Sequence, residues 1–284
     1  MFRLLELVAP ALGALWANRI WFRIPAAPQR EVDLPPGSPF EVESQGRTVR
    51  GTVWGEGPVV YLVHGWGGRG TDLAPFVRPL LEHGRRVVTF DAPSHGVSDA
   101  GALGRRRTHG VEVGRAFDAV AARFGPAEAV VAHSMGAVVT LLTLKYGWLG
   151  AGRIVLVAPM TRLASQLAAF RVALGIGRRT EARMDRAIHR MVGHPVGEFE
   201  VAGLYEEVGP LPMLLVHDKA DRTTPYTASL DLSTRTGARV LTTSGLGHHR
   251  VLRDPAVVGA VVDFVVGAPS DLETVRSAPG GRAA

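Results

Sequence analysis

The clearest sign of chemistry in the sequence is a serine between two small residues, in the run Ala132-His133-Ser134-Met135-Gly136. A sharp strand-to-helix turn needs small residues two before and two after its tip, because the two backbones approach closely there. Such a turn exposes the serine oxygen and aims the next backbone N–H at the reacting centre from the positive end of the helix. Taken alone, the run predicts either a nucleophile or a serine that caps the helix.

Three more motifs accompany this turn: a glycine-rich run at 64–68, an acidic stretch at 214–225, and a Gly-His pair at 247–248. Together the four motifs resemble the α/β-hydrolase family over roughly residues 40–266. The family's usual Gly-x-Ser-x-Gly has Ala132 at its first position here, a departure that some lipases and esterases share. The resemblance implies an α/β-hydrolase fold, with a mostly parallel central sheet flanked by helices and a small helical cap inserted before the acid-bearing strand.

The resemblance also implies an oxyanion hole. In the family this hole is formed by the N–H after the nucleophile and by one from the loop after the third strand, which here are the N–H groups of Met135 and Trp66. Two preorganised donors stabilise the charge that develops on the carbonyl oxygen, and removing one typically raises the barrier by about 3–4 kcal/mol. Glycines let the loop bend close to the substrate. The supporting loop consists of His64, Gly65, Gly67 and Gly68.

The general base is expected after the last strand, where the family's Gly-His element matches His248. Imidazole suits this role because its ordinary pKa of about 6.5 lets it take and return a proton near neutrality. The neighbouring His249 is the alternative, although the glycine before His248 favours the latter. The resemblance makes His64 a structural residue of the loop, since the family does not use that histidine as its base.

The acid that orients the imidazole is expected in the stretch 214–225, which resembles the family's strand followed by Gly-x-x-Asp-x-x-x-Pro. Asp221 aligns with the family's acid. Asp218 stands where the family usually has glycine, and it is therefore a second candidate. The chain order Ser134, Asp221, His248 is the order expected on this fold.

The hydrophobic pattern predicts the elements that would position these residues. Two strands at 40–44 and 48–54 form a hairpin, and short apolar runs and helical patterns then alternate along the chain. Such alternation predicts a parallel sheet with helices on both faces and ligands at the carboxyl ends of its strands. The apolar runs lie at 59–63, 87–90, 129–132, 154–157, 213–216 and 240–242, and the helical patterns at 71–83, 108–124, 135–146 and 255–264.

With this alternation, the resemblance implies an α/β-hydrolase domain over residues 31–266. Within it, residues 160–208 contain two stretches with helical spacing and no strand, which indicates a helical cap of about that length over the edge of the sheet. The stretch is rich in Leu, Phe, Met and Ala, so it favours an apolar substrate pocket. The Gly/Pro/Ser/Ala-rich segment 267–284 is expected to be a flexible tail.

Residues 1–30 form a separate apolar segment. Glu6 and Pro10 interrupt it, and it is too short to span a bilayer, which needs about 20 apolar residues. Aromatic side chains and arginines mix at 16–23, as is typical of interfacial segments. The segment is therefore either a peripheral membrane contact or a helix packed on the protein's own surface.

The composition excludes several classes of protein. With 284 residues, 46% of them hydrophobic, the chain is not intrinsically disordered. The absence of cysteine excludes a disulfide scaffold, a thiolate zinc site and a cysteine nucleophile. The net charge of +6 comes almost entirely from arginine, because Lys145 and Lys219 are the only lysines. These arginines are scattered without interleaved aromatic residues, which argues against a nucleic-acid partner.

These observations predict a serine hydrolase, specifically a carboxylesterase that cleaves apolar alkyl or aryl esters through an acyl-enzyme. We expect a small-molecule ester as substrate, no cofactor, no metal and a cytoplasmic location, with membrane contact through the N-terminal segment left open. The same triad also serves thioesterases, C–C bond hydrolases and cofactor-free haloperoxidases. A catalytically inactive binding protein of this fold is the alternative outside enzymes.

Overall fold

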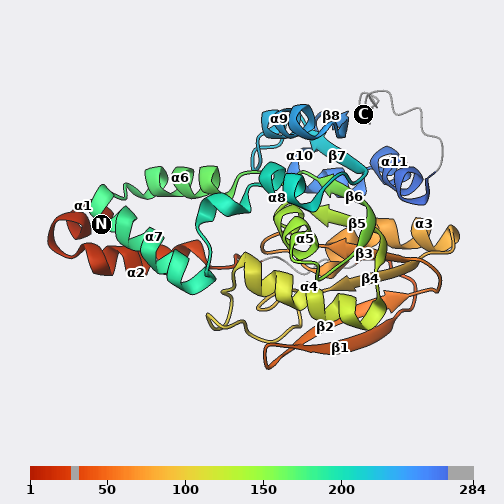
Figure 1. Cartoon of the computed structure of the whole chain (residues 1–284), viewed down its shortest axis with the longest axis horizontal. Helices are drawn as coiled ribbons and strands as arrows, with labels where there is room; N and C mark the ends of the chain where they lie inside the picture. The colour runs from red at the N-terminus through yellow and green to blue at the C-terminus, as the bar shows by residue number, and fades with distance from the viewer. Residues whose placement is uncertain (27–31, 268–284) are drawn as a thin grey trace, which may run out of the picture.

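The computed structural model describes residues 1–26 and 32–267, so the predicted tail lies outside it from residue 268 onward. A single eight-stranded sheet forms its centre (Figure 1). The strands are β1 (Ser38–Ser44), β2 (Arg47–Trp54), β3 (Val59–Val63), β4 (Arg86–Phe90), β5 (Ala127–His133), β6 (Ala151–Val157), β7 (Met213–Asp218) and β8 (Arg239–Thr243).

The strand order is β1-β2-β4-β3-β5-β6-β7-β8. β2 is antiparallel to both β1 and β4, and all the other neighbouring strands are parallel. The predicted hairpin turns at Gln45 and Gly46, whose φ angles of 51° and 73° match the two left-handed positions of a type I′ turn. The expected mostly parallel sheet is confirmed, and its antiparallel part is this hairpin.

Helices cover both faces of the sheet because each face of its buried strands is apolar. The larger core lies under α4 (Gly110–Phe124), α5 (Gly136–Lys145), α8 (Val201–Val208) and α9 (Tyr226–Thr236). The opposite core lies under α3 (Val77–Glu82) and α11 (Pro255–Val266). Short helical turns η1 (Gly70–Phe76), η2 (Val196–Phe199), α10 (Gly247–Arg250) and η3 (Val251–Arg253) complete the connections.

The helix expected at 71–83 differs from the prediction. It consists of the 3-10 turn η1 followed by the short helix α3. Pro79 has no N–H to donate to the carbonyl four residues earlier, that of Pro75, and its ring would clash with that carbonyl in a continuous α-helix. The break therefore follows from the two prolines.

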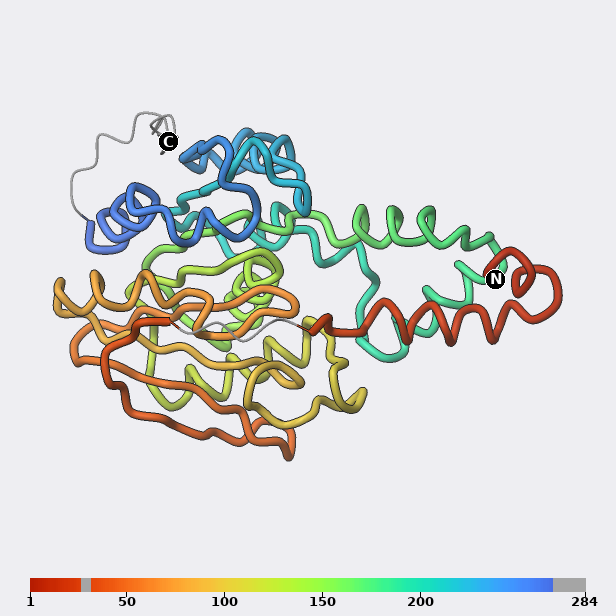
Figure 2. The backbone as a smooth tube through the Cα atoms, turned by 180° about the vertical axis from the view of Figure 1, so that it is seen from behind, coloured from red at the N-terminus to blue at the C-terminus, as the bar shows by residue number. Residues whose placement is uncertain are grey.

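Residues 160–208 divide into two parts. α6 (Leu163–Leu174) and α7 (Arg178–Val192) extend away from the sheet and do not fold over its edge (Figures 1 and 2). α8, which the periodicity did not predict, packs on α5, and its Val201 and Leu204 belong to the larger core. The predicted insertion thus contributes both to a projecting part and to the helix layer on the sheet.

The N-terminal segment forms α1 (Phe2–Val8) and α2 (Pro10–Trp21), which run alongside α6 and α7 in both backbone views (Figures 1 and 2). We call these four helices the helical arm. Its own small core joins residues from both halves of the chain. The fully or nearly buried members are Phe2, Ala14, Ala17, Phe22, Leu167, Met184 and Ile188.

Small residues let α2 approach α7 closely. A Cβ added to Gly13 would lie only 3.1 Å from Thr180 Oγ1. Glu6 fixes the start of α7, because its carboxylate accepts hydrogen bonds from the N–H groups of Arg179 at 2.8 Å and Thr180 at 3.0 Å. These N–H groups have no partner within their own helix. One side of the N-terminal segment therefore packs on the protein itself.

Among the helices in the described ranges 1–26 and 32–267, none has both the length and the apolar composition required to cross a membrane.

Candidate active site

Ser134 lies at the tip of the sharp turn between β5 and α5. Its φ of +54° is in the left-handed region, which a serine adopts only under strain. A Cβ on Gly136 would come within 2.7 Å of the carbonyl oxygen of Val63 on the adjacent strand β3. The glycine two residues after the serine is thus required by the close approach of helix and strand. This geometry turns the serine hydroxyl out of the sheet.

The structure brings the three residues of the predicted triad together. His248 Nε2 lies 3.1 Å from Ser134 Oγ, and His248 Nδ1 lies 2.7 Å from Asp221 Oδ2. Asp221 follows β7, and His248 follows β8 on the short helix α10. The Asp221 side chain is fully buried, and the His248 side chain is 7% exposed. A continuous hydrogen-bonded path therefore runs from the carboxylate to the serine hydroxyl.

The surroundings of Asp221 stabilise its charged form. Burial alone would raise the pKa of this carboxyl, but hydrogen bonds from His217 and His248 and from the backbone N–H groups of Thr224 and Thr223 lower the pKa well below its ordinary value. Thr224 Oγ1 also donates to Asp221 Oδ2 at 3.0 Å. The carboxylate is therefore charged throughout the neutral and mildly acidic range.

Asp218, the second candidate for the acid, has different contacts. Its Oδ1 accepts from the N–H of Ala220 at 2.8 Å, and its Oδ2 accepts from Thr243 Oγ1 at 2.7 Å and from the N–H of Leu246 at 3.0 Å. Burial opposes its ionisation, and these bonds with one from Gly247 lower its pKa below the ordinary value. Asp218 thus ties β7 to the loop that leads to His248, and its carboxylate makes no bond to that imidazole.

His133, which the sequence did not single out, supports the imidazole from the other side. Its Nε2–H donates to the backbone carbonyl of His248 at 3.0 Å. Burial, together with repulsion from His248, lowers the pKa of His133 to about 3, so the ring is neutral near pH 7. Its place directly before the serine was the only sequence signal. His249, the alternative base, packs against the rings of His133 and His248 and lines the pocket. The hydrogen bond to Ser134 is made by His248.

The loop after β3 passes directly over the serine turn. A Cβ on Gly65 would lie 2.9 Å from Ser134 Cβ, so only glycine fits there. Within the described ranges, neither the N–H of Trp66 nor that of Met135 donates to a protein acceptor. The Gly68 N–H closes the loop by donating to the Gly65 carbonyl at 3.0 Å. The two N–H groups predicted to form the oxyanion hole are therefore available beside the serine turn.

Two histidines hold this loop. His64 Nε2 accepts from the N–H of Ala92 at 3.0 Å, and its Nδ1–H donates to the carbonyl of Gly65 at 2.7 Å. His95 Nε2 accepts from the N–H of Gly67 at 3.1 Å. Burial and the proximity of His64 lower the pKa of His95 to about 3, which keeps its Nε2 free of a proton and able to accept. His64 thus has the structural contacts expected of it, and His95 is an additional support.

Comparison with known families gives the same assignment as the fold. The profile of the Alpha/beta hydrolase family matches residues 60–261, which is most of the chain. This chain belongs to the α/β-hydrolase family. A comparison with curated proteins finds no significant match for this chain.

Several solved structures share the fold of this chain. Est1E from Butyrivibrio proteoclasticus, solved with ferulic acid bound, has a TM-score of 0.64 and 18% identity over 80% of this chain and 99% of its own. A bromoperoxidase from Bacillus anthracis has a TM-score of 0.62 and 15% identity over 81% of this chain and 100% of its own. The thioesterase domain from the curacin biosynthetic pathway has a TM-score of 0.59 and 17% identity over 82% and 100%. At these identities the likeness concerns the fold alone.

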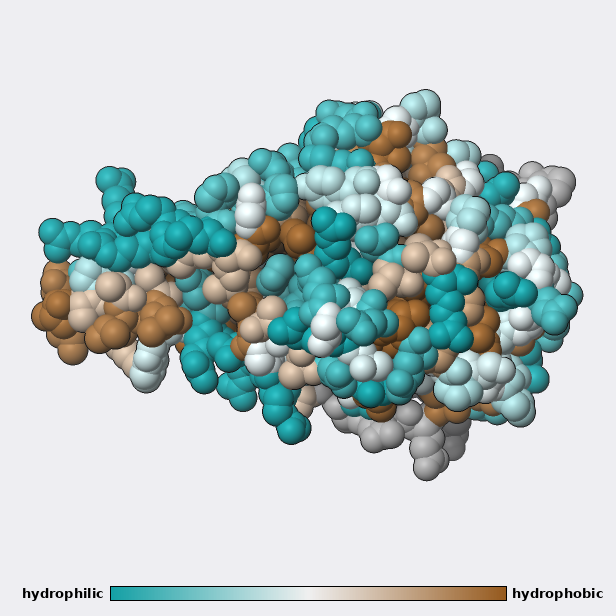
Figure 3. All heavy atoms as spheres, turned by 60° about the horizontal axis from the view of Figure 1, so that its bottom comes forward, coloured by the Kyte–Doolittle hydropathy of each residue, from teal (hydrophilic) through white to brown (hydrophobic). Residues whose placement is uncertain are grey.

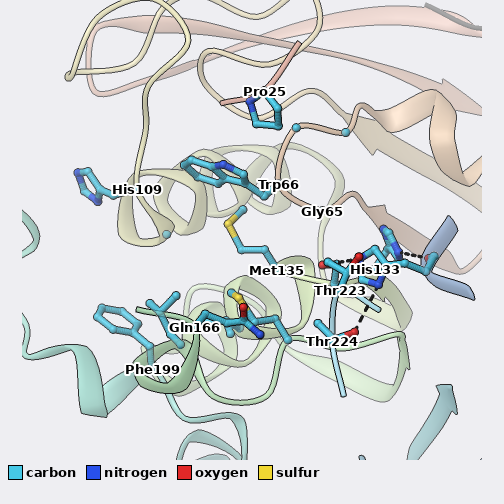
Figure 4. Close-up of a pocket in the computed structure, with 18 of the residues that line it drawn as sticks. Pro25, Gly65, Trp66, His109, His133, Met135, Gln166, Phe199, Thr223 and Thr224 are labelled. Atoms are coloured by element: carbon cyan, nitrogen blue, oxygen red, sulfur yellow. Dashed lines mark hydrogen bonds between the residues drawn. The ribbon is translucent and has the colours of Figure 1, made fainter. Parts of the chain in front are cut away.

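Ser134 lines a cavity of about 580 Å³ with a mainly apolar wall (Figure 4). Trp66, Met135 and Gln166 lie along it, and Phe199 lies toward the end away from His133 and Thr224 (Figure 4). The helical arm supplies further wall residues. These are Trp21, Leu163, Gln166, Ile188 and Val192, and Phe22 directly after α2 adds to them.

The chain that follows α2 reaches the oxyanion loop directly, which the sequence did not predict. Trp66 Nε1 donates to the carbonyl of Arg23 at 3.2 Å. A Cβ on Gly67 would come within 2.7 Å of the ring of Pro25. The N-terminal segment therefore forms part of the site. In the part of the chain that the structure describes, no three His, Asp or Glu side chains are grouped as metal ligands.

Proposed function

We propose that this chain is a serine hydrolase that cleaves carboxylic esters through an acyl-enzyme. The observation that carries the proposal is the path of hydrogen bonds from Asp221 through His248 to Ser134, at 2.7 and 3.1 Å, at the wall of an apolar cavity. This arrangement of a nucleophile, a base and an orienting acid is recognised by its geometry.

In the first step, Ser134 Oγ attacks the ester carbonyl carbon while His248 Nε2 takes the hydroxyl proton. The charged Asp221 accepts the Nδ1–H and so keeps Nε2 unprotonated for this task. The N–H groups of Met135 and Trp66 stabilise the negative charge that develops on the carbonyl oxygen. When the tetrahedral intermediate collapses, the bond to the alcohol oxygen breaks and Nε2–H protonates the leaving alcohol.

The second step repeats the first with water as nucleophile. His248 takes a proton from water, the resulting hydroxide attacks the acyl carbon, and the bond to Ser134 Oγ breaks as the proton returns to that oxygen. Both steps need only groups of this chain, so the proposal includes no cofactor.

The wall of the cavity favours an apolar alkyl or aryl ester. Val138, Met160, Val192, Val196 and Phe199 contribute apolar surface, and Gln166 is a polar group among them. Apolar walls with few polar groups are typical of pockets that bind apolar small molecules. A thioester would meet the same nucleophile and the same N–H donors, so a test of the substrate class must include one.

A fluorophosphonate probe tests the proposal, because it reacts with an activated serine and stays attached. We expect one label per chain, at Ser134, and no label on the Ser134→Ala or His248→Ala variants. Ser165→Ala, which removes an exposed serine of α6, is the matched control and should label like the wild type. A folded wild type that does not label would refute the proposal.

A panel of p-nitrophenyl esters of increasing chain length, with one matched thioester, then defines the substrate class. The proposal predicts faster turnover of the ester than of the thioester relative to their uncatalysed rates. A thioester preference on this scale would replace the carboxylesterase assignment by a thioesterase assignment.

A further inference from the structure

The outer side of the N-terminal helices carries an unusual apolar surface. Eight of the twelve large hydrophobic side chains that are exposed in the described part of the chain lie within the first 20 residues. Figure 3 shows apolar surface gathered at the end of the molecule that α1 and α2 form. We call this surface the outer apolar face. It consists of Met1, Leu4, Leu7, Val8, Leu12, Leu15, Trp16 and Ile20, which are 41–73% exposed.

The burial of α2 is the reverse of that in an ordinary surface helix. Its side toward the other arm helices consists of Gly13, Ala14, Ala17 and Asn18, while four of its large apolar residues face outward: Leu12, Leu15, Trp16 and Ile20. A helix of a water-soluble protein normally turns its large apolar residues inward. Packing against the arm therefore does not explain the residues of the outer apolar face, and contiguous apolar surface of this kind marks an interaction site.

The charges on and around this face are positive. Arg3 and Arg19 are exposed between its apolar residues. Glu6, the only carboxylate in α1 and α2, is bonded to the N-terminus of α7. The four arm helices contain eight arginines and three carboxylates, a net charge of +5 out of the +6 of the whole chain. Five of these arginines are exposed on α7, at positions 178, 179, 183, 186 and 190.

We propose that the outer apolar face docks on an anionic phospholipid membrane surface. Leu12 and Leu15 would enter the acyl boundary, and Trp16 would lie at the interface, where its amphipathic ring is favoured. Arg3 and Arg19 and the arginines of α7 attract the anionic headgroups. A second copy of the chain is the other occupant that such a face could take, but it would bring the same positive charges together with no carboxylate on the face to pair with them.

The docked helix is connected to the pocket. Trp21 and Phe22, at the end of α2, line the cavity, and the chain continues to Arg23 and Pro25 against the oxyanion loop. Docking would therefore bring one wall of the cavity near the bilayer, where apolar esters concentrate. This consequence rests on the proposed hydrolase function, whereas the docking itself does not.

Vesicle flotation with the full chain tests the docking. We expect the protein to float with vesicles of phosphatidylcholine and phosphatidylglycerol, to float less with phosphatidylcholine alone, and to lose anionic selectivity at high salt. The triple variant Leu12→Gln, Leu15→Gln, Trp16→Gln should bind about a thousandfold more weakly, since each of the three large side chains removed from an apolar environment weakens binding by about tenfold.

Matched controls separate docking from folding and from catalysis. Val97→Gln with Leu230→Gln removes exposed apolar side chains elsewhere and should float like the wild type. Ser134→Ala should also float like the wild type, so an inactive site does not affect the result. If the triple variant does not fold, the charge reversal Arg3→Glu with Arg19→Glu replaces it, and it should weaken the preference for anionic vesicles.

Three results would overturn the proposal. The first is a folded wild type that does not float with anionic vesicles. The second is a triple variant, or the charge reversal in its place, that floats as well as the wild type. The third is a wild type that is dimeric and a triple variant that is monomeric in light scattering, while neither protein floats with vesicles. That result would assign the face to a second copy of this chain.

Discussion

One aspartate ends β7 and a second lies three residues further on, and the two make separate sets of bonds. Asp221 bonds to His248, while Asp218 bonds to Thr243 and to the backbone near Leu246. Both carboxyls have lowered pKa values, so charge alone does not distinguish them. Their contacts do, since only one of them reaches the imidazole.

Replacing each aspartate by asparagine should therefore have different effects. We expect Asp221→Asn to lower kcat by about 10³- to 10⁴-fold with little change in Tm, because the imidazole loses the charge that orients and stabilises it. Asp218→Asn should lower Tm while kcat stays within about tenfold, because it weakens bonds that fix the loop. Ester kinetics and thermal unfolding measure both, and a larger loss of kcat in Asp218→Asn would reverse the assignment.

The buried histidines predict a loss of stability in acid. An unfolded histidine binds a proton near pH 6.5, whereas His95 and His133 in the folded chain do so only at about pH 3. Between these values the unfolded state holds more protons, so the free energy of unfolding decreases as the pH falls. From pH 7 to 5 we expect a loss of about 2 kcal/mol for each of the two histidines.

Denaturant unfolding at pH 7 and pH 5 measures this loss. Of the loss of unfolding free energy that the two histidines cause between pH 7 and pH 5, His95→Gln should remove about half. His83→Gln changes an exposed histidine on the surface and serves as control. A free energy of unfolding that stays constant between the two pH values would contradict neutral buried rings.

At the scale of elements, the loop after β3 and the turn after β5 are in direct contact. Gly65→Ala would place a Cβ 2.9 Å from Ser134 Cβ, so the loop must shift. Displacements of about 1 Å reduce rates by about 100-fold, and we expect a loss of kcat of that size. Gly203→Ala on α8, where a Cβ meets nothing within 4 Å, is the control. Unchanged kcat in Gly65→Ala would show that this loop does not position the oxyanion donors.

Local patterns in the sequence predict an element well where the geometry of that element alone decides which residues it can contain. Ala132 and Gly136 around the serine follow from one tight turn, and the β1–β2 hairpin follows from Gln45 and Gly46. These features could be predicted because the physical requirement and the residues that meet it are neighbours in the sequence.

Contacts between distant segments could not be predicted in this way. Gly67 bonds to His95, 28 residues away, and Glu6 bonds to Thr180, 174 residues away. Helical periodicity predicts α6 and α7, but it contains no information about the helices on which they pack. The supporting residues of the site and the helical arm therefore became visible only in the fold.

At the scale of the whole molecule, the cavity is built where the sheet domain meets the arm. The serine and its partners come from the carboxyl ends of β5, β7 and β8, where ligands of open parallel sheets bind. The arm contributes Trp21, Ile188 and Val192 to the wall. The shape of the cavity thus depends on segments at both ends of the sequence.

A change in the arm should therefore alter substrate selection and leave the chemistry intact. Val192→Trp adds bulk to a half-buried position of the wall. We expect kcat/KM for long-chain p-nitrophenyl esters to fall by about tenfold relative to short-chain esters, because the added ring occupies space that a long chain would need. Equal losses for all chain lengths would mean that Val192 does not border the part of the cavity that binds the chain.

The most direct test of the account is rapid mixing of the protein with an excess of p-nitrophenyl ester, followed by mass spectrometry of the acid-quenched protein. The account predicts a fast release of about one nitrophenol per chain and an acyl group bound to the peptide that contains Ser134. Both should be absent in His248→Ala. Turnover of the ester with the acyl group on another residue, or undiminished release in Ser134→Ala, would contradict it.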